Sequence, residues 1–263
     1  MIVIDIIPDI HGRAQKLLRA LKNLGWERRK LTWWHPDPNR EIIFLGDFID
    51  RGPENKAVIQ VVRELIDTGR AEAIMGNHEL NALHFHCVDP NTGRPLRAWS
   101  QKNIDQHKTF LAEFPINADE TKEVLNWMKE LPLFIEKDQC RAVHAAWIQP
   151  AIDNLHKYTP NGVLSEDLLI RAARDGDNVQ HLVETIAKGP EAKLDDGFYF
   201  LDKGGVQRDA VRLKWWNSEA KTWRDAAVSV PDICQIPGSP LPSSLATNFY
   251  PISDRPVFLV TTS

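Results

Sequence analysis

Three short segments in the first third of the chain hold side chains that commonly bind metal ions. They are Asp9-x-His11-Gly12, Gly46-Asp47-x-x-Asp50-Arg51-Gly52 and Gly76-Asn77-His78-Glu79. Mixed oxygen and nitrogen donors without a nearby thiolate suit Mn²⁺, Fe or Zn²⁺ better than an iron–sulfur cluster. Burying carboxylates and a guanidinium together is costly unless they are paired or hold a metal. The residue types therefore indicate a functional site rather than three unrelated turns.

Each motif follows a segment that reads as a strand. The apolar runs 2–7, 41–45 and 71–75 end at the three motifs, and helices are predicted over 13–24 and 54–68. The almost continuous apolar run 2–7 predicts a central strand buried on both faces. Successive strand–turn–helix units favour a parallel sheet, and ligands bind outside the carboxyl ends of such strands. The side chains of residues two apart on an extended backbone point the same way, so Asp9 and His11 are expected to bind one metal ion together.

The remainder of the chain divides by composition. We expect an exposed loop or hairpin over 27–40, helices over 100–131, and a hairpin of runs 133–136 and 140–143 that delivers His144. Residues 150–190 are polar and mostly helical, and a helical cap insertion over 148–195 is predicted. The chain becomes β-rich after Gly197, in runs 198–201, 206–213 and 226–233, and a last strand is expected over 256–260.

Composition excludes several classes of protein. The chain has 263 residues, 43% of them hydrophobic, which suits one domain, 1–263, with a sizeable core. The net charge of −4 gives no general attraction to nucleic acid or an anionic membrane, and no apolar run is long enough for a membrane span. The first residues read as a strand and not a signal peptide. Three scattered cysteines favour a reduced, cytoplasmic protein.

The three motifs, in this order, resemble the metallophosphoesterase (calcineurin-like) superfamily, in the form found in its phosphoprotein phosphatase branch. That branch includes serine/threonine phosphatases and bacterial diadenosine tetraphosphatases. The resemblance covers residues 8–79 strongly and continues weakly through His144 and 197–216. It implies an α/β (α+β, four-layer) fold, in which a central mixed β-sandwich is flanked by helices.

The resemblance also implies a role for each motif residue. Asp9 and His11 would bind the first metal, Asp47 would bridge both, and Asn77 and His144 would bind the second. Arg51, together with Asn77, would hold phosphate oxygens, and its fork of donors matches phosphate geometry. His78, oriented by Asp50, would protonate the leaving group. The metals would be two divalent ions, expected to be Mn²⁺, with Fe or Zn²⁺ as alternatives.

The predicted activity is hydrolysis of phosphate monoesters, on a phosphoprotein or a small phosphoester, through attack of a metal-bound hydroxide. A dinucleoside polyphosphate hydrolase is the alternative, for which Arg208, Arg212 and Trp215 are candidate contacts to a second phosphate or a base. The alternative, that Arg208 and Arg212 lie on the solvated face of a strand and bind no ligand, stays open. A third alternative, from another class, is a catalytically impaired phosphate-binding scaffold. The sequence leaves the oligomeric state open.

The chain departs from the family pattern in two places. Ala145-Ala146 follows His144 where two glycines are usual, and no histidine follows His181, although the family supplies a late Gly-His ligand. Truncation, true loss and a frameshift are the explanations considered. In the frameshift hypothesis, codons for Phe-Phe-Gly-His-Tyr have lost one base. They would then be translated as Phe-Leu-Val-Thr-Thr, which is the sequence of residues 258–262. Outside the motifs, His84 and His86 are not expected to share a metal, and the remaining histidines are expected at the surface or in packing: His35, His107, His156 and His181.

Overall fold

A three-stranded parallel sheet forms the first layer of the molecule. The computed structural model describes residues 2–30, 32–246, 250 and 255–260. The strands β1 (Val3–Ile7), β4 (Arg40–Phe44) and β5 (Ala71–Ala73) pair in the order β1-β4-β5. Their parallel pairing confirms the three strand–turn–helix units. The prediction of a central first strand is wrong, because β1 lies at the edge of this sheet and its first residue, Val3, is 40% exposed.

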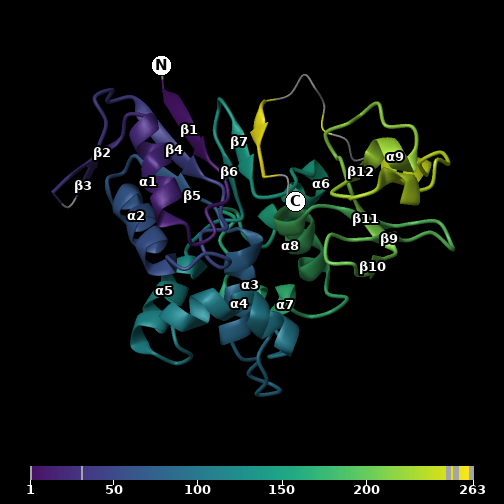
Figure 1. The fold of residues 1–263 in the computed structure, drawn as a ribbon, viewed down its shortest axis with the longest axis horizontal. Helices are drawn as coiled ribbons and strands as arrows, with labels where there is room; N and C mark the ends of the chain where they lie inside the picture. Colours follow the sequence, from purple (N-terminus) through teal and green to yellow (C-terminus); the bar gives the residue numbers. More distant parts are fainter. Residues whose placement is uncertain (1, 31, 247–249, 251–254, 261–263) are drawn as a thin grey trace.

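A second, mixed sheet faces the first one. It contains β6 (Phe134–Glu136), β7 (Arg141–Val143) and β13 (Val257–Phe258), with β6 antiparallel and β13 parallel to β7. Buried side chains from the two sheets form one cluster, which comprises Ile43, Leu45, Ile74, Cys140 and Ala142. The two sheets therefore make the central β-sandwich that was predicted, and Figure 1 shows them side by side in the middle of the molecule.

Helices cover the outer face of the first sheet. Ile42 and Phe44 of β4 point away from the sandwich, into the main core with α1 (Ala14–Asn23) and α2 (Asn55–Asp67). The apolar residues of α2 recur at helical spacing, so one stripe of this helix is buried against the sheet. The other helices that join this core are α3 (Asn77–His86), α4 (Gln101–Glu113), α5 (Asp119–Lys129), α6 (Gln149–His156), α7 (Glu166–Ala172) and α8 (Asn178–Lys188).

The predicted 148–195 insertion contains the three helices α6 to α8. Ser165 accepts a hydrogen bond from the Leu168 backbone N–H, as expected for the residue that caps α7. The apolar residues of these helices belong to the main core. That they close over the site as a cap stays a prediction.

The last third of the chain builds a smaller β-rich part with its own hydrophobic cluster around Val211, Leu213 and Trp223. Its elements are β8 (Glu191–Lys193), β9 (Phe200–Leu201), β10 (Gln207–Arg208), β11 (Ala210–Leu213), α9 (Trp223–Ala226), β12 (Ala227–Val228), a 3₁₀ turn (Ile233–Gln235) and α10 (Ser243–Ala246). It lies on the right of Figure 1, opposite α1 and α2.

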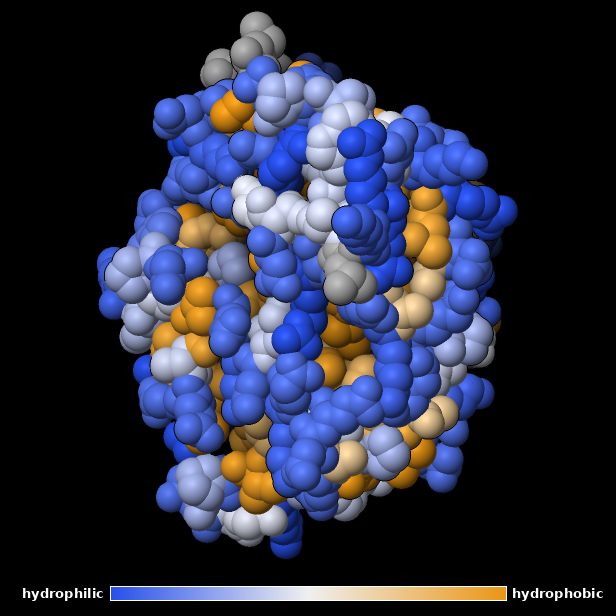
Figure 2. Space-filling view, turned by 90° about the vertical axis from the view of Figure 1, so that its left-hand side faces the viewer, coloured by the Kyte–Doolittle hydropathy of each residue, from blue (hydrophilic) through white to orange (hydrophobic). Residues whose placement is uncertain are grey.

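The segment 27–40 forms a hairpin of β2 (Glu27–Arg29) and β3 (Thr32–Trp34), as predicted, although its Trp33 and His35 are buried. The face of the molecule on this side is mainly hydrophilic, and hydrophobic residues show only in scattered, recessed groups (Figure 2). None of the helices in the described part of the chain combines the length and apolar character needed to cross a bilayer.

Candidate metal centre

The first two motifs are joined through their backbones. The N–H groups of Ile10 and His11 both donate to the carbonyl of Asp47, over 3.1 and 2.9 Å, and the Gly12 N–H donates to the carbonyl of Phe48 over 2.7 Å. Because β1 and β4 are parallel neighbours, the turns that follow them leave the sheet side by side. The sheet therefore brings the two motifs together, as the sequence predicted.

Glu79 ties the second motif to the third. Its buried carboxylate accepts hydrogen bonds from the backbone N–H groups of Asp47, Phe48 and Gly76, over 2.7, 2.9 and 3.0 Å. Burial, followed by the charge of Asp47, raises the pKa of Glu79 to about 7. The third sequence motif includes Glu79, but the sequence alone predicted no role for this residue. Its place at the start of α3, where an acid stabilises a helix, was the available signal.

Two glycines allow these loops to touch. A β-carbon on Gly46 would overlap the backbone of Gly76, and one on Gly76 would overlap Asp47. Gly46 also has a φ of +87°, a conformation that side chains rarely adopt. The close approach keeps Asp47 against the start of α3, where the His78 N–H donates to its Oδ1 over 2.9 Å.

Four residues of the first two motifs other than glycine adopt a left-handed backbone. The φ angles of His11, Asp47, Asp50 and Arg51 are 49°, 53°, 69° and 62°. A left-handed conformation of such a residue lowers the free energy of unfolding by about 1–3 kcal/mol. It persists only where surrounding contacts hold the backbone in place. The expected extended backbone between Asp9 and His11 is therefore wrong. A turn, held by the hydrogen bonds to Asp47, brings their side chains to one place.

One group of donor atoms surrounds His11. Its Nδ1 donates to the carbonyl of Ile49 over 3.2 Å, which leaves Nε2 as the unprotonated nitrogen. Nε2 lies 3.5 Å from Oδ2 of Asp9 and 3.7 Å from Oδ2 of Asp47, too far for hydrogen bonds. His11 Nε2 and one Asp9 oxygen, Oδ1, are buried without a hydrogen-bond partner. Atoms that attract a cation and lack a partner fit a metal ion held between them.

A second group of donors surrounds His144, which β7 delivers from the other sheet. Its Nδ1 donates to the carbonyl of Leu45 over 2.6 Å, so Nε2 faces the site. Nε2 lies 3.0 Å from Oδ1 of Asn77 and 3.5 Å from Oδ1 of Asp47. His144 is completely buried. The hairpin thus places His144 where the sequence predicted, although Ala145-Ala146 follows it.

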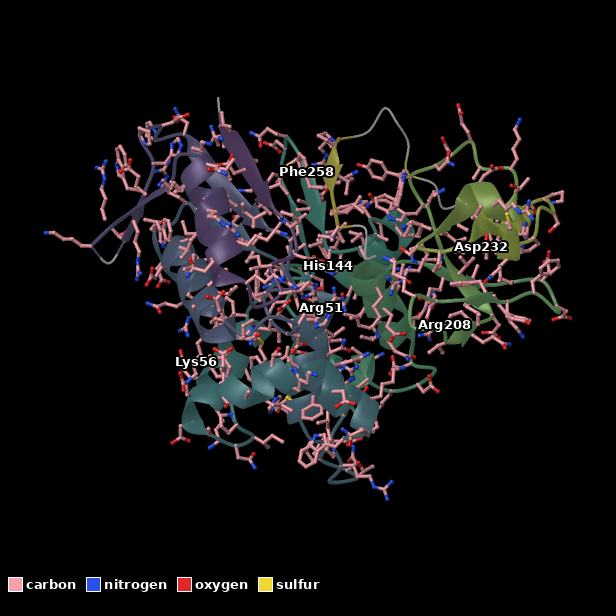
Figure 3. The ribbon with its side chains drawn as sticks, in the orientation of Figure 1. Arg51, Lys56, His144, Arg208, Asp232 and Phe258 are labelled. Carbon is pink, nitrogen blue, oxygen red and sulfur yellow. The ribbon has the colours of Figure 1, made fainter. Side chains whose placement is uncertain are left out.

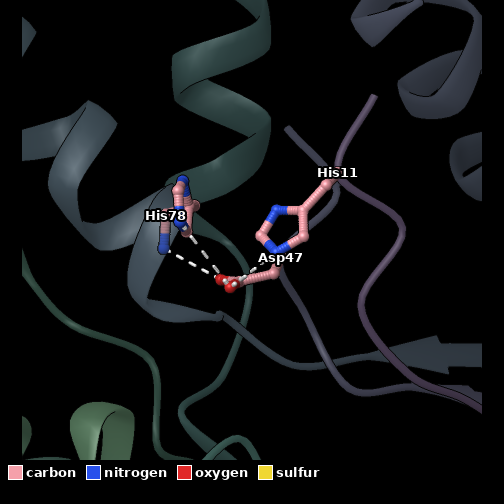
Figure 4. Close-up of side chains that lie close together, drawn as sticks. All are labelled: His11, Asp47 and His78. Atoms are coloured by element: carbon pink, nitrogen blue, oxygen red, sulfur yellow. Dashed lines mark hydrogen bonds and ion pairs between the residues drawn. The ribbon is translucent and has the colours of Figure 1, made fainter. Parts of the chain in front are cut away.

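Asp47 belongs to both groups. One set of mutually close ligand atoms comes from His11, Asp47 and His78, and another from Asp9, Asp47 and His144. Figure 4 shows the Asp47 carboxylate between the rings of His11 and His78. Burial raises the pKa of Asp47, but His144 and then His78 outweigh it and hold the pKa below its ordinary value. Burial lowers the pKa of His144, but the charge of Asp47 raises it to about 9.

Asp50 lies behind His78. Its Oδ2 accepts a hydrogen bond from Nδ1 of His78 over 2.7 Å, so the two residues contact each other as predicted. Burial lowers the pKa of His78, but Asp50, followed by Asp47, raises it above its ordinary value. A histidine whose Nδ1 is held by a carboxylate presents Nε2 to the site.

Asp50 has a second histidine partner that sequence reasoning did not assign to the site. Nδ1 of His107, from α4, donates to the other oxygen of Asp50 over 2.8 Å. His107 is a buried packing residue, as expected, since it is 3% exposed and stacks on Phe110, but its bond to a motif residue was not predicted. The pair is separated by 57 residues and leaves no local sequence signal.

The turn that contains Asp50 is held by Asn55, at the start of α2. The Asp50 N–H donates to Oδ1 of Asn55 over 2.8 Å, and Nδ2 of Asn55 donates to the Gly52 carbonyl over 3.1 Å. Asn55 is fully buried. An amide side chain just after a Gly-Pro turn was the signal for this role, and sequence reasoning missed it.

A cavity of about 570 Å³ opens next to these residues. Its lining includes Asp50, Arg51, Asn77 and His78, and continues to α4 and the β-rich part. The cationic residues of the lining in the described chain are Arg51, Arg97, Lys102, Lys108, Lys188, Arg208 and Arg212, and its carboxylates are Asp50 and Asp105. The cavity is therefore strongly basic although the chain carries a net charge of −4.

The structure brings Arg208 and Arg212 to this cavity, but both already have acidic partners. Arg208 pairs with Asp202 over 2.8 Å and Arg212 with Glu191 over 3.2 Å. Figure 3 places Arg51 near the centre of the molecule and Arg208 on the β-rich side. That either arginine binds substrate stays a prediction.

Trp215, a candidate contact to a base, is a buried residue. It is 3% exposed, and its Nε1 donates to the carbonyl of Ala145 over 3.0 Å. A buried indole with a satisfied N–H supports the loop after His144, and that Trp215 contacts a base stays a prediction.

His84 and His86 have separate partners, in line with the expectation that they share no metal. Nε2 of His84 contacts the carbonyl of Leu169 at 3.1 Å, whereas Nε2 of His86 lies 3.2 Å from Nε2 of His107. Burial lowers the pKa of each of the two histidines to about 4.

Comparisons with known proteins agree with this geometry. Residues 2–242 match the family described as calcineurin-like phosphoesterase. The chain belongs to the calcineurin-like phosphoesterase family. This membership confirms the resemblance drawn from the three motifs and the prediction of a phosphoric ester hydrolase.

Relatives of this phosphoesterase include bis(5'-nucleosyl)-tetraphosphatases PrpE [asymmetrical]. The protein of that name from Halalkalibacterium halodurans is 30% identical over 67% of this chain and 70% of its own. The one from Geobacillus sp. (strain WCH70) is 40% identical over 67% of this chain and 71% of its own. A solved metallophosphoesterase from Sphaerobacter thermophilus is 20% identical, with a TM-score of 0.36 over 54% of this chain and 46% of its own.

The late Gly-His ligand has no counterpart in the described part of this phosphoesterase. The Val260 N–H donates to the carbonyl of His144 over 2.9 Å, so the chain after β13 runs directly beside this candidate ligand. Residues 261–263, on which the frameshift hypothesis partly depends, lie outside the described residues. That hypothesis stays a prediction.

Proposed function

We propose that this phosphoesterase hydrolyses nucleotides that carry a chain of phosphates, of the dinucleoside tetraphosphate kind. The basic cavity is the observation that supports this substrate most directly, since its cations continue from Arg51 to α4 and to the β-rich part. A single phosphate needs only the clamp at Arg51, whereas a polyphosphate presents charge along its whole length. The relatives named as tetraphosphatases support the same choice.

Arg97 is the cation best suited to a second phosphate. Its Nη2 donates to the neutral side-chain oxygens of Asn103 and Gln106, over 3.0 and 2.7 Å. Within the described chain no carboxylate forms an ion pair with it, and burial lowers its pKa. A partly buried guanidinium that is held in place by neutral groups retains its charge for an anionic ligand.

The donor atoms support a site for two divalent ions. Asp9, His11 and Asp47 would hold one, and Asp47, Asn77 and His144 the other. Oxygen and imidazole donors without thiolate favour Mn²⁺, with Fe or Zn²⁺ as alternatives. When bound, such a pair of ions polarises a phosphoryl group and activates a water molecule.

The protein's own groups complete the reaction. Arg51 would hold oxygens of the attacked phosphate. Water would add to phosphorus while the bond from phosphorus to the bridging oxygen breaks. His78, held by Asp50, would give its Nε2 proton to that leaving oxygen, a contribution of about 10²–10⁴-fold in rate.

Two rival functions lead to different expectations. The monoester phosphatase predicted from the sequence uses the same motif residues and requires no cations beyond Arg51. The catalytically impaired scaffold would not need the Asp50–His78 pair, whose bond of 2.7 Å is present. The pair therefore argues for catalysis, and the cavity argues for the longer anion.

A substrate panel tests the proposal. The purified chain is loaded with Mn²⁺ and assayed with diadenosine tetraphosphate, p-nitrophenyl phosphate and a phosphopeptide, with chromatography of the nucleotide products. We expect the highest kcat/KM with diadenosine tetraphosphate. A higher value with either monoester would reject the polyphosphate assignment, and no turnover of any substrate in a metal-loaded sample would favour the scaffold.

A further inference from the structure

Both oxygens of the Asp50 carboxylate are occupied by histidines from different helices. Oδ2 accepts from Nδ1 of His78 at the start of α3, over 2.7 Å, and Oδ1 accepts from Nδ1 of His107 in α4, over 2.8 Å. The Asp50 side chain is 3% exposed. With one bond on each oxygen, the carboxylate cannot rotate about χ2 without breaking both.

His107 is itself held on several sides. Its ring stacks on Phe110 with centroids 4.7 Å apart and an interplanar angle of 18°, and it contacts Phe85 at 5.2 Å. Nε2 of His107 lies 3.2 Å from Nε2 of His86. The aromatic contacts fix the plane of the ring, and the contact with His86 fixes its rotation within that plane.

The acceptor on Asp50 determines where His107 carries its hydrogen. A carboxylate oxygen only accepts, so Nδ1 of His107 must be the donor. In neutral His107, Nε2 is then an acceptor, and Nε2–H of His86 donates to it. Burial and the neighbouring His107 lower the pKa of His86 to about 4, which keeps His86 neutral in this chain of contacts near neutral pH.

We propose that His107 is a positioning residue that acts on the leaving-group proton through Asp50. By holding Oδ1, it keeps Oδ2 directed at His78, and His78 therefore keeps its hydrogen on Nδ1 and its Nε2 toward the reacting phosphate. The inference rests on the proposed role of His78 but not on which phosphate substrate is hydrolysed. Under this proposal, α4 helps to orient His78, the proposed acid, although α4 lies outside the three motifs.

Three substitutions separate positioning from packing. His107→Asn places an amide N–H close to the position of Nδ1 and can still donate to Asp50. His107→Gln places its amide near Nε2, toward His86, and leaves Asp50 without this donor. His107→Phe keeps the ring between Phe85 and Phe110 and has no donor. His181→Asn, at an exposed position on α8, is the matched control.

Leaving-group dependence is the first readout. Phenyl phosphate needs a proton on its departing oxygen far more than 2,4-dinitrophenyl phosphate does. We expect His107→Phe and His107→Gln to lower kcat on phenyl phosphate about 10–100-fold, the usual effect of losing an orienting partner, with KM unchanged. Both should change kcat on the dinitrophenyl ester much less, and His107→Asn should recover most of the loss. Equal losses on both esters would mean that His107 only packs, and would overturn the proposal.

Nitrogen NMR of the histidine rings is the second readout and needs no turnover. In the wild-type chain, without and with Mg²⁺ as a diamagnetic ion, His107 and His78 should each carry a hydrogen on Nδ1. At a pH high enough to remove the Nε2 proton of wild-type His78, the His78 ring should become a mixture of tautomers in His107→Gln, whereas in His107→Asn it should keep its hydrogen on Nδ1. A wild-type His107 with its hydrogen on Nε2 alone would overturn the proposal even if every variant failed to fold. If no phosphate ester is hydrolysed, the proposed function fails, and this measurement still decides the role of His107.

Discussion

His144 donates its Nδ1 hydrogen to the carbonyl oxygen of Leu45 over 2.6 Å. Leu45 follows β4 of the first sheet and His144 follows β7 of the second, so this bond joins the two halves of the sandwich at the site. A histidine that is fixed in this way directs Nε2 at the site, and this nitrogen must give up its proton to bind a metal. His144 therefore has a structural role and a proposed ligand role, which substitutions can separate.

We predict that His144→Asn separates them. The asparagine amide can still donate to Leu45 but has no atom at the position of Nε2. It should weaken binding of the second ion at least about tenfold and lower kcat, while the metal-free protein loses less of its free energy of unfolding than His144→Ala does. His144→Ala should lose both. Calorimetric Mn²⁺ titration and urea unfolding measure the two effects, and unchanged Mn²⁺ binding in His144→Asn would show that His144 is no ligand.

Asn55 should control the turn that holds Asp50 and Arg51. Asn55→Ala removes the acceptor of the Asp50 N–H and the donor to the Gly52 carbonyl, both buried. A buried polar group that is left without its hydrogen-bond partner lowers the free energy of unfolding by about 1–3 kcal/mol. The left-handed conformations of Asp50 and Arg51 also lose their support, so kcat should fall together with stability. Asn91→Ala, in an exposed loop, is the control, and equal urea midpoints for the two variants would contradict this account.

Arg97→Gln should distinguish long anions from short ones. The substitution removes a cation of the cavity and leaves the three motifs unchanged. We expect a rise in KM for diadenosine tetraphosphate and little change for p-nitrophenyl phosphate, because a monoester ends at Arg51. Arg19→Gln, exposed on α1, serves as the matched charge control. Equal effects of Arg97→Gln on both substrates would place Arg97 in the structure of the site rather than in recognition of a second phosphate.

The buried His84 should make the protein sensitive to acid. Burial lowers its pKa from 6.5 to about 4, so the unfolded chain takes up this proton at a higher pH than the folded one. The stability associated with neutral His84 is complete above pH 6.5 and is lost as the pH falls toward 4. The loss reaches about 3 kcal/mol only below pH 4, where the folded form is protonated as well.

His84→Gln tests this dependence. The glutamine amide can donate to the Leu169 carbonyl in place of Nε2 and does not titrate in this range. Urea unfolding of the metal-free protein between pH 7 and 4.5 should show a shallower decline for His84→Gln than for the wild type. Parallel declines would mean that His84 is already protonated in the folded chain. His181→Gln, at an exposed position, should follow the wild-type curve.

Local pattern was sufficient for much of the fold. The apolar runs before the motifs and the helical spacing in α2 are properties of short segments, and the structure has strands and helices there. The hairpin before His144 was predictable for the same reason, because the turn at Lys137-Asp138-Gln139 separates two short apolar runs. Strand order was not predictable, and β1 lies at the edge because apolar composition alone does not specify neighbours.

Contacts between distant segments account for what the sequence did not reveal about the site. His107 and Asp50 are 57 residues apart, and Trp215 and Ala145 are 70 apart. Nothing in the neighbourhood of either residue distinguishes a site contact from ordinary packing. The backbone of His11 was also mispredicted, since the left-handed turn depends on hydrogen bonds from the next motif. Side chains that support a site are thus harder to find than the side chains that form it.

The interior of the sandwich combines branched aliphatic side chains with the smaller Cys140 and Ala142. Asp47 leaves one sheet and His144 leaves the other, so the thickness of this layer sets how far apart the two ligands stand. The layer works as a spacer for the metal site. Enlarging Ala142 to valine would therefore move His144 relative to Asp47, and the spacing of the two ions would change before the fold is lost.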